Sequence, residues 1–288
     1  MQALEDTIEV LGQPVFVRRL GAAAEPSAYI ARWQHGAAVV DVAPSRTIRL
    51  TMSLVDGRNA EDDKGAALAD RIRGGSVSIF SPAEGATVEV NGAADVVQLF
   101  VDQTYAEAAL DAPFTSPPMY GLRDDPIRAA MMRVLVTSIR NGPDDALMVE
   151  EELQALALSI ERLARSERAG TLRTMFHGGL SPAAFRRVRA MIEAALDHGN
   201  SPTLADMARA VDLSITHFVR AFRQQTGTTP HKYIVSRRMD RAVSLLRLKA
   251  NSVGDVADGV GFSTPAQFVA AFRAAMGVTP GAVRDALS

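Results

Sequence analysis

The first hundred residues contain short runs in which apolar and polar positions alternate, which is the spacing of β-strands rather than helices. We expect eight strands, at residues 15–17, 29–33, 38–42, 47–55, 68–72, 77–80, 87–90 and 96–101. Turn pairs such as Asp56-Gly57 and Asn91-Gly92 separate several of them. Because no helix-length segment lies between the runs, the pattern favours an antiparallel barrel or jelly roll over a parallel sheet.

After Asp102 the apolar positions recur every three or four residues, which predicts helices. One helix is expected from Asp124 to the stop at Asn141, and a second from about Asp144 to Arg165. Two interpretations of these helices within residues 124–166 remain open. They cover the open side of the barrel, or one apolar face pairs with its copy in a homodimer.

Residues 168–180 have no sustained period and contain three glycines, which is typical of a linker. A new helix then begins at Ser181-Pro182. We therefore divide the chain into an N-terminal domain of residues 1–170, a linker at 171–180 and a C-terminal domain of residues 181–288. The expected fold class is α+β with two domains, the second of them all-helical.

The last ninety residues contain an internal duplication. The two copies align at an offset of 49 residues from Asp206, and at an offset of 50 after one inserted residue. The matched pairs include Phe218 with Phe268, Phe222 with Phe272, Arg223 with Arg273, Gly227 with Gly277 and Pro230 with Pro280. Two copies of one supersecondary unit are therefore predicted, at about 203–227 and 253–277.

Each copy has the pattern of a helix, a tight turn and a second helix. In the first copy the turn falls at Asp212-Leu213, and Ser214 is the expected N-cap of the second helix; in the second copy the N-cap is expected at Ser263. A second helix of this kind fits a DNA major groove. The helix predicted at 230–249 would hold the two units so that their second helices enter successive grooves.

The charges of the two halves differ. Residues 1–170 hold 16 Lys and Arg against 25 Asp and Glu, a net of −9, whereas residues 171–288 hold 15 against 8, a net of +7. A basic domain suits a polyanion such as double-stranded DNA, since phosphate contacts supply most non-specific affinity. A solvated basic face or a helical domain that binds only protein is the alternative interpretation.

The C-terminal residues resemble the conserved pattern of the AraC/XylS family of bacterial transcription regulators, over about residues 180–288. The resemblance rests on Leu180-Ser181, the run from Leu213 to Arg223, residues 227–230, Arg238, Ala242, Gly261-Phe262-Ser263, Phe268, Phe272-Arg273, Gly277 and Thr279-Pro280. It implies a sequence-specific DNA-binding regulator, usually an activator, with RNA polymerase as a partner. It also implies a cupin-like N-terminal domain that binds a small-molecule effector or dimerises.

The outer faces of the two second helices supply the candidate DNA-binding residues. These are Ile215, Thr216, His217, Val219, Arg220, Arg223, Thr264, Pro265, Ala266, Gln267, Ala270 and Arg273. Arg220 is the strongest candidate because an arginine bonds guanine with two parallel hydrogen bonds. In the second unit only Gln267 offers a polar group near the base-reading end, so sequence specificity is expected mainly in the first half-site.

Candidates for an effector pocket in the N-terminal domain are Tyr29, Trp33, His35 and Phe80, with core packing or a strand-end position as the alternative for each. His35 is the only histidine among the first 170 residues, so no metal site is expected. The chain has no cysteine and no Gly-x-Ser-x-Gly motif, and we expect neither a catalytic residue nor a cofactor. A repressor, an effector-independent regulator and a cupin-type enzyme fused to a DNA-binding domain remain alternatives.

The location of the protein is expected to be cytoplasmic. No run of 18 apolar residues occurs, and the N-terminus lacks a cationic and then apolar signal region, so no membrane partner is expected. An effector would act by shifting dimer geometry or by changing how firmly the N-terminal domain holds the basic one.

Overall fold

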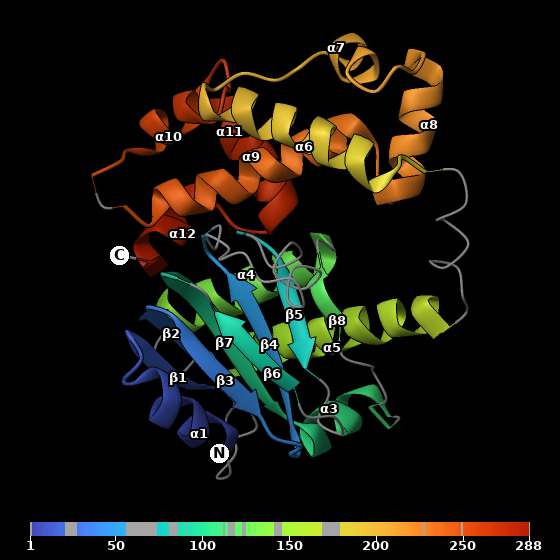
Figure 1. Cartoon of the computed structure of the whole chain (residues 1–288). Coiled ribbons are helices and arrows are strands. Elements are labelled where there is room, and N and C mark those ends of the chain that lie inside the picture. Colours follow the sequence, from blue (N-terminus) through green and yellow to red (C-terminus); the bar gives the residue numbers. More distant parts are fainter. Residues whose placement is uncertain are drawn as a thin grey trace.

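The computed structural model describes residues 2–20, 28–55, 74–80, 86–90, 92–111, 113–114, 119–122, 125–140, 146–168, 179–226, 228–248 and 250–287. An N-terminal β-sheet is flanked by helices on both faces, and a helical C-terminal domain lies across one end of the sheet (Figure 1). The predicted linker at 171–180 falls mostly outside the described residues.

The N-terminal strands form two antiparallel sheets. Their bounds are β1 Phe16–Leu20, β2 Ala28–His35, β3 Ala38–Val42, β4 Thr47–Ser53, β5 Val77–Phe80, β6 Ala86–Val90, β7 Ala94–Asp102 and β8 Met119–Leu122. Six of them make one sheet in the order β1-β2-β7-β4-β5-β8, and β3 pairs with β6 in a separate two-stranded ribbon. In the large sheet Thr51 of β4 lies opposite Gln98 of β7.

The antiparallel sheet is confirmed, but the described strands do not close into a barrel. The six-stranded sheet has free edges at β1 and β8. The strand predicted at 68–72 lies outside the described residues, and β8 was not predicted. Alternation along one strand tells which side chains share a face, but it carries no information about which strands pair. The cupin-like closure therefore remains a prediction.

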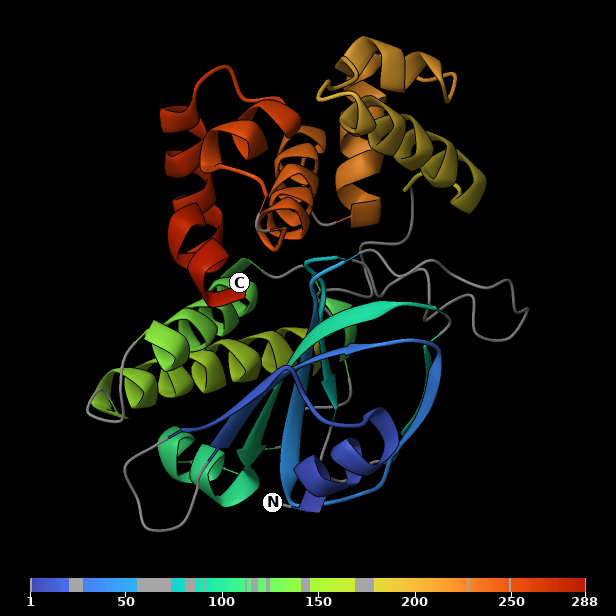
Figure 2. The same cartoon turned by 90° about the vertical axis from the view of Figure 1, so that its left-hand side faces the viewer.

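Two long helices, α4 Asp125–Arg140 and α5 Ala146–Arg168, cover one face of the six-stranded sheet. Their apolar residues, among them Met131 and Leu156, pack in one cluster with Leu50 and Leu99 of the sheet. Figure 2 shows these helices and the ribbon on opposite sides of the sheet. The covering interpretation therefore accounts for the apolar face that the sequence identified, and dimerisation through these helices remains a prediction.

Two short helices were not predicted, α1 Gln2–Leu11 and α3 Gln103–Leu110. Ala3 and Leu4 of α1 pack on Trp33 and Phe100, on the sheet face opposite α4 and α5. Helices of ten and eight residues present too few turns for a clear period in the sequence.

The C-terminal domain is all-helical, as predicted. Its helices are α6 Pro182–Asp197, α7 Leu204–Arg209, α8 Ile215–Thr226, α9 Pro230–Leu246, α10 Val253–Gly259, α11 Pro265–Met276 and α12 Pro280–Leu287. The linking helix α9 ends three residues earlier than the predicted limit at residue 249, and α12 was not predicted.

The two helix-turn-helix units belong to different hydrophobic cores. Phe218 and Phe222 of the first unit pack in a cluster formed by α6, α7, α8 and the start of α9. Phe268 and Phe272 of the second unit lie in the same cluster as the sheet, α4 and α5. Helix α9 contributes to both clusters. The second unit is therefore packed onto the N-terminal domain, whereas the first unit has a core of its own.

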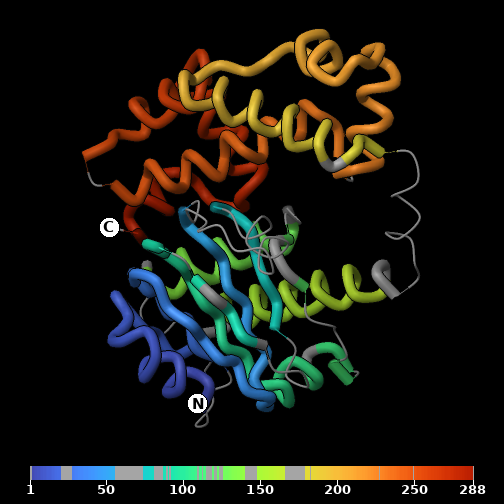
Figure 3. Tube along the Cα trace, in the orientation of Figure 1, coloured from blue at the N-terminus to red at the C-terminus, as the bar shows by residue number. Residues whose placement is uncertain are grey.

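Polar contacts reinforce the packing between the domains. Arg32 of β2 donates to the backbone oxygen of Leu287 at 2.6 Å, which fixes the C-terminal helix beside the sheet, as the trace in Figure 3 shows. Ser244 of α9 donates to the backbone oxygen of Leu54 at 2.8 Å. Both contacts satisfy backbone groups that the interface would otherwise desolvate.

Candidate nucleic-acid interface

The first unit has the geometry that the sequence predicted. Thr203 caps α7, and Asp212 takes a left-handed conformation with φ of 55° in the turn. The backbone NH of His217 donates to the Ser214 hydroxyl, so Ser214 caps α8 as predicted. Behind the helix, the rings of Phe218 and Phe222 lie 5.5 Å apart and are fully buried. This packing fixes the angle between the two helices and presents the other face of α8 outward.

The second unit repeats this geometry. Gly261, the counterpart of Asp212, has φ of 79°, and the Phe268 and Phe272 rings are again 5.5 Å apart. The N-cap of α11 is Thr264, whose side chain accepts from the NH of Gln267. The predicted cap at Ser263 is therefore wrong. Pro265 at the first helical position accounts for the shift, because its fixed φ starts the helix one residue later.

The outward face of α8 carries the strongest candidates together. Thr216, Arg220 and Arg223 are exposed, and they lie on the side of the helix opposite Phe218. Neither arginine forms an ion pair with any residue that the structure describes. Ile215 is 47% exposed at the N-terminal end of the same helix, and Val219 is partly buried. Two free guanidinium groups and a hydroxyl on one helix face suit contacts with phosphates and base edges.

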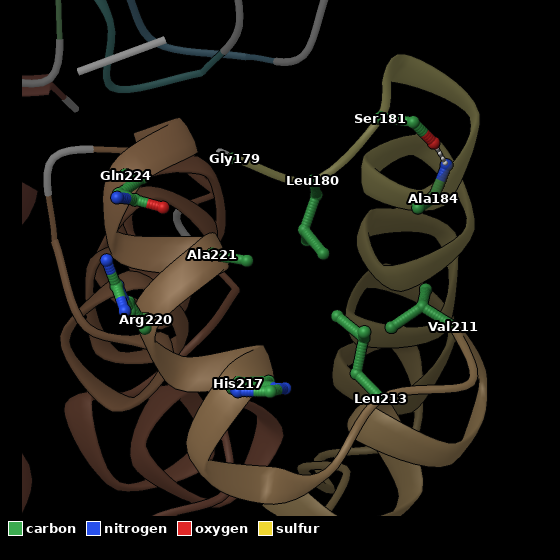
Figure 4. Close-up of a pocket in the computed structure, with 10 residues that line it drawn as sticks. All are labelled: Gly179, Leu180, Ser181, Ala184, Val211, Leu213, His217, Arg220, Ala221 and Gln224. Carbon is green, nitrogen blue, oxygen red and sulfur yellow. Dashed lines mark hydrogen bonds between the residues drawn. The ribbon is translucent and has the colours of Figure 1, made fainter. Parts of the chain in front are cut away.

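A cleft of about 480 Å³ runs alongside α8. In Figure 4, His217 and Ala221 of α8 point across this space toward Leu213 and Leu180, and Arg220 and Gln224 line it from the same helix. Gln224 was not among the predicted residues, although it follows Arg220 by four positions and therefore shares its face. The cleft leaves this side of the helix accessible, and all its polar lining residues except Ser181 come from α8.

The outward face of α11 carries fewer hydrogen-bonding groups at its centre than that of α8. At the position of Arg220 the second unit has Ala270, and at the position of Thr216 it has Ala266, both exposed. Pro265, Gln267 and Arg273 are exposed as well. The structure thus places the predicted residues of the second unit together on one accessible face, with alanine methyl groups at its centre.

The arginines of α9 and its C-cap residue Arg247 contact other elements of the chain. Arg237 pairs with Glu193 at 2.6 Å, Arg241 pairs with Asp197, and Arg247 pairs with Asp95 at 3.3 Å. Burial lowers the pKa of Arg238, whose guanidinium lies 5.4 Å from the centre of the Phe262 ring. These arginines are therefore less available to an external polyanion than the number of basic residues in this segment would suggest.

The four predicted effector residues fall in two places. Trp33 is fully buried, its ring NH donates to the backbone oxygen of Gly12, and it packs with Tyr29 in the cluster under α1. Those two serve as core, the alternative that the sequence left open. His35 and Phe80 line a separate cavity between the large sheet and the ribbon.

Within the described part of the chain, no group of three or more His, Asp or Glu side chains is arranged to hold a metal ion. Among the described helices, none has both the length and the apolar character needed to cross a bilayer.

Residues 207–286 match a family model described as a helix-turn-helix domain. The uncharacterised HTH-type transcriptional regulator YidL of Escherichia coli is 41% identical over 81 residues, 28% of this chain and 27% of that protein. The Msm operon regulatory protein of Streptococcus mutans is 28% identical over 141 residues, 49% of this chain and 48% of that protein. This chain therefore spans less than half the length of either relative.

Among solved structures, the DNA-binding domain of AdpA in complex with a target DNA is similar at 30% identity. The match covers 35% of this chain and 91% of that one, with a TM-score of 0.32. The sequence matches coincide with the two units described above, so the C-terminal part of the chain is a helix-turn-helix domain of the AraC type.

Proposed function

We propose that this protein is a sequence-specific DNA-binding transcription regulator. The observation that carries the proposal is the pair of capped second helices, α8 and α11, whose outward faces are both accessible on one chain. The names of YidL and the Msm operon regulatory protein support transcription regulation as the role.

In this proposal α8 reads bases and α11 mainly positions the complex. Arg220 at the centre of the α8 face bonds a guanine edge, and Thr216 meets a base or a thymine methyl. On α11 the methyl groups of Ala266 and Ala270 contact thymine methyls or pack against a groove whose shape depends on the DNA sequence, while Arg273 contacts a phosphate. Specificity is then concentrated in the first half-site.

The finer part of the proposal is that the regulator is an activator that responds to a small-molecule effector and contacts RNA polymerase. The contacts between the N-terminal domain and the second unit support it, because a ligand that altered the sheet would act on α11 through α4. A homodimer through α4 and α5 would rest on residues that remain exposed there, Met148 and Leu158. A repressor of the same architecture is the alternative.

The direct test is selection of genomic fragments by the full-length protein at near-physiological salt. We expect a shared motif of two half-sites about one helical turn apart. Arg220→Ala should relax the motif at one position and weaken binding by about 1–3 kcal/mol.

Arg46→Ala is the matched control, because it removes an exposed arginine just before β4 of the N-terminal domain and should leave the motif intact. Uniformly weak binding to all fragments, with the same salt dependence for both variants, would contradict the proposal.

A further inference from the structure

The six-stranded sheet has one apolar face and one unusually polar face. Along β4, Ile48, Leu50 and Met52 point toward α4 and α5, and the alternating positions Arg49 and Thr51 therefore point the other way. That second face would be expected to meet water. It is covered instead by the β3–β6 ribbon and by α1.

A cavity of about 90 Å³ lies between the polar face and the ribbon, several times the space that one water molecule needs. Its ribbon side is apolar, with Val40, Val42, Val88 and Val90. Its sheet side carries the polar side chains of Arg49, Thr51, Ser53, Ser78 and Gln98 beside the apolar Phe80 and Val96. The ribbon thus supplies only apolar groups, and the hydrogen-bonding side chains come from the sheet.

Three polar atoms of the sheet wall have no hydrogen-bond partner among the described residues: Arg49 Nε, Thr51 Oγ1 and Gln98 Oε1. The side chains of Arg49 and Gln98 are deeply buried, at 5% and 6% exposure. Buried polar groups in folded proteins are almost always satisfied, so a cluster of three on one cavity wall needs an explanation.

Arg49 is a buried cation that no carboxylate contacts within the described part of the chain. Its terminal nitrogen donates to the Ala3 carbonyl at 3.1 Å, and its guanidinium lies 5.1 Å from the centre of the Phe100 ring. Burial lowers the pKa of Arg49 to about 10, and the charge of Asp6 only partly offsets that effect. A buried charge normally has a partner of opposite sign, because isolation from water is costly.

We propose that this cavity binds a small amphipathic carboxylate. Its anionic group accepts hydrogen bonds from Arg49 and Thr51, and its apolar body lies against the valines of the ribbon. A hydroxyl on the ligand would donate to Gln98 Oε1. Arg49 and Gln98 are diagonal neighbours on paired strands, within reach of one small molecule.

Binding at this cavity does not depend on DNA binding, and only its role as an effector site rests on the proposed function. His35 and Phe80, which the sequence suggested for an effector pocket, also line this cavity. Arg49, Thr51 and Gln98 add a cation, a hydroxyl and an amide to the lining that those two residues provide.

The test uses the full-length chain with two carboxylates, pentanoate and cyclohexanecarboxylate, and with their uncharged amides as matched probes. Thermal unfolding and calorimetry should show binding of at least one acid and of neither amide. At five times its dissociation constant the acid should raise the unfolding midpoint by about 2–4 °C. No shift with either acid, or equal shifts with acid and amide, would overturn the proposal and leave a hydrated core cavity.

Variants locate the site. Arg49→Met should weaken acid binding by about 10- to 100-fold, the value of one charge-assisted hydrogen bond. Arg46→Met, which removes an exposed arginine just before β4, should leave the affinity unchanged. Gln98→Glu gives Arg49 a carboxylate partner inside the fold and repels the anionic ligand, so it should also abolish binding even if Arg49→Met fails to fold. Unchanged affinity in Gln98→Glu would overturn the proposal.

Arg220→Ala separates this inference from the proposed function. That variant should bind the acid as tightly as the parent chain while its DNA motif relaxes at one position. Acid binding without any DNA motif in the parent would leave the cavity site intact and contradict only the regulator.

Discussion

Arg128 of α4 donates to Asp240 of α9 at 2.6 Å, and the two side chains are only 1% and 3% exposed. This ion pair joins the N-terminal domain to the helix that links the two helix-turn-helix units. The other oxygen of Asp240 accepts from Arg237 at 2.9 Å, and Arg237 also pairs with Glu193. A Cβ at Gly75 would overlap the Asp240 carboxylate, so the loop ahead of β5 closes the site. The linking helix is thus held by charge as well as by packing.

Because Asp240 pairs with two arginines, removing its charge should lower the free energy of unfolding more than removing one of the arginines. Asp240→Asn leaves two buried arginines without their shared carboxylate, and should lower the free energy of unfolding by about 3–5 kcal/mol. Arg128→Met leaves Asp240 paired with Arg237, and should cost clearly less. Urea unfolding of both variants measures the difference, and equal losses would mean that Arg237 contributes nothing at this site.

The sequence predicted the elements that depend on local pattern. The duplication located α8 and α11 to within a residue of their observed starts, because turn glycines, caps and phenylalanine spacing are local signals. The sequence did not predict that α11 packs on α4, because a contact between distant segments produces no periodic pattern of apolar residues in either segment. The polar alternation of β4 was visible, but Arg49 and Thr51 would have been assigned to solvent without knowledge of the ribbon above them.

Acid should weaken the contact between the sheet and α9 through Asp95. Burial alone would raise the pKa of Asp95, but hydrogen bonds from Arg32 and Gln34 and the charge of Arg247 outweigh it and lower the pKa below 3.8. A group with a lowered folded pKa stabilises the fold above its unfolded pKa and loses that contribution as pH falls through the folded value.

Asp95→Asn provides the comparison for this prediction. The stability difference between the parent and the variant should be constant from pH 7 to about pH 5 and should shrink below about pH 4. Urea unfolding across this range measures it. A difference that already shrinks between pH 7 and pH 5 would assign the effect to another group.

The separate core of the first unit predicts local unfolding. Phe222 is fully buried and its ring lies 5.4 Å from that of Tyr233. Phe222→Ala should cost about 3–5 kcal/mol and speed amide hydrogen exchange in α6, α7 and α8. Amides of β7 and α4 should exchange as before. Phe272→Ala, the matched change in the shared core, should accelerate exchange in α4 instead, and identical patterns for the two variants would indicate one cooperative unit.

Substitutions at the two left-handed turn positions should have different effects on the stability of the fold. Gly261→Ala places a side chain at φ of 79° and against the Gly199 carbonyl, and should cost at least about 1–3 kcal/mol. Asp212→Gly removes strain at φ of 55° and should change stability by less than about 1 kcal/mol. Thermal unfolding of both variants tests this, and a tolerated Gly261→Ala would mean that the turn relaxes freely.

Ala270 offers a gain-of-function test of how the second unit reads DNA. Ala270→Arg places a guanidinium where the first unit has Arg220, and should add a guanine preference to the second half-site, worth about 1–3 kcal/mol. Ala270→Lys adds the same charge without the bidentate fork, so it should strengthen binding to all fragments evenly. Fragment selection with both variants distinguishes the outcomes. If Ala270→Arg strengthened binding without a new base preference, α11 would lie along the phosphates rather than in the groove.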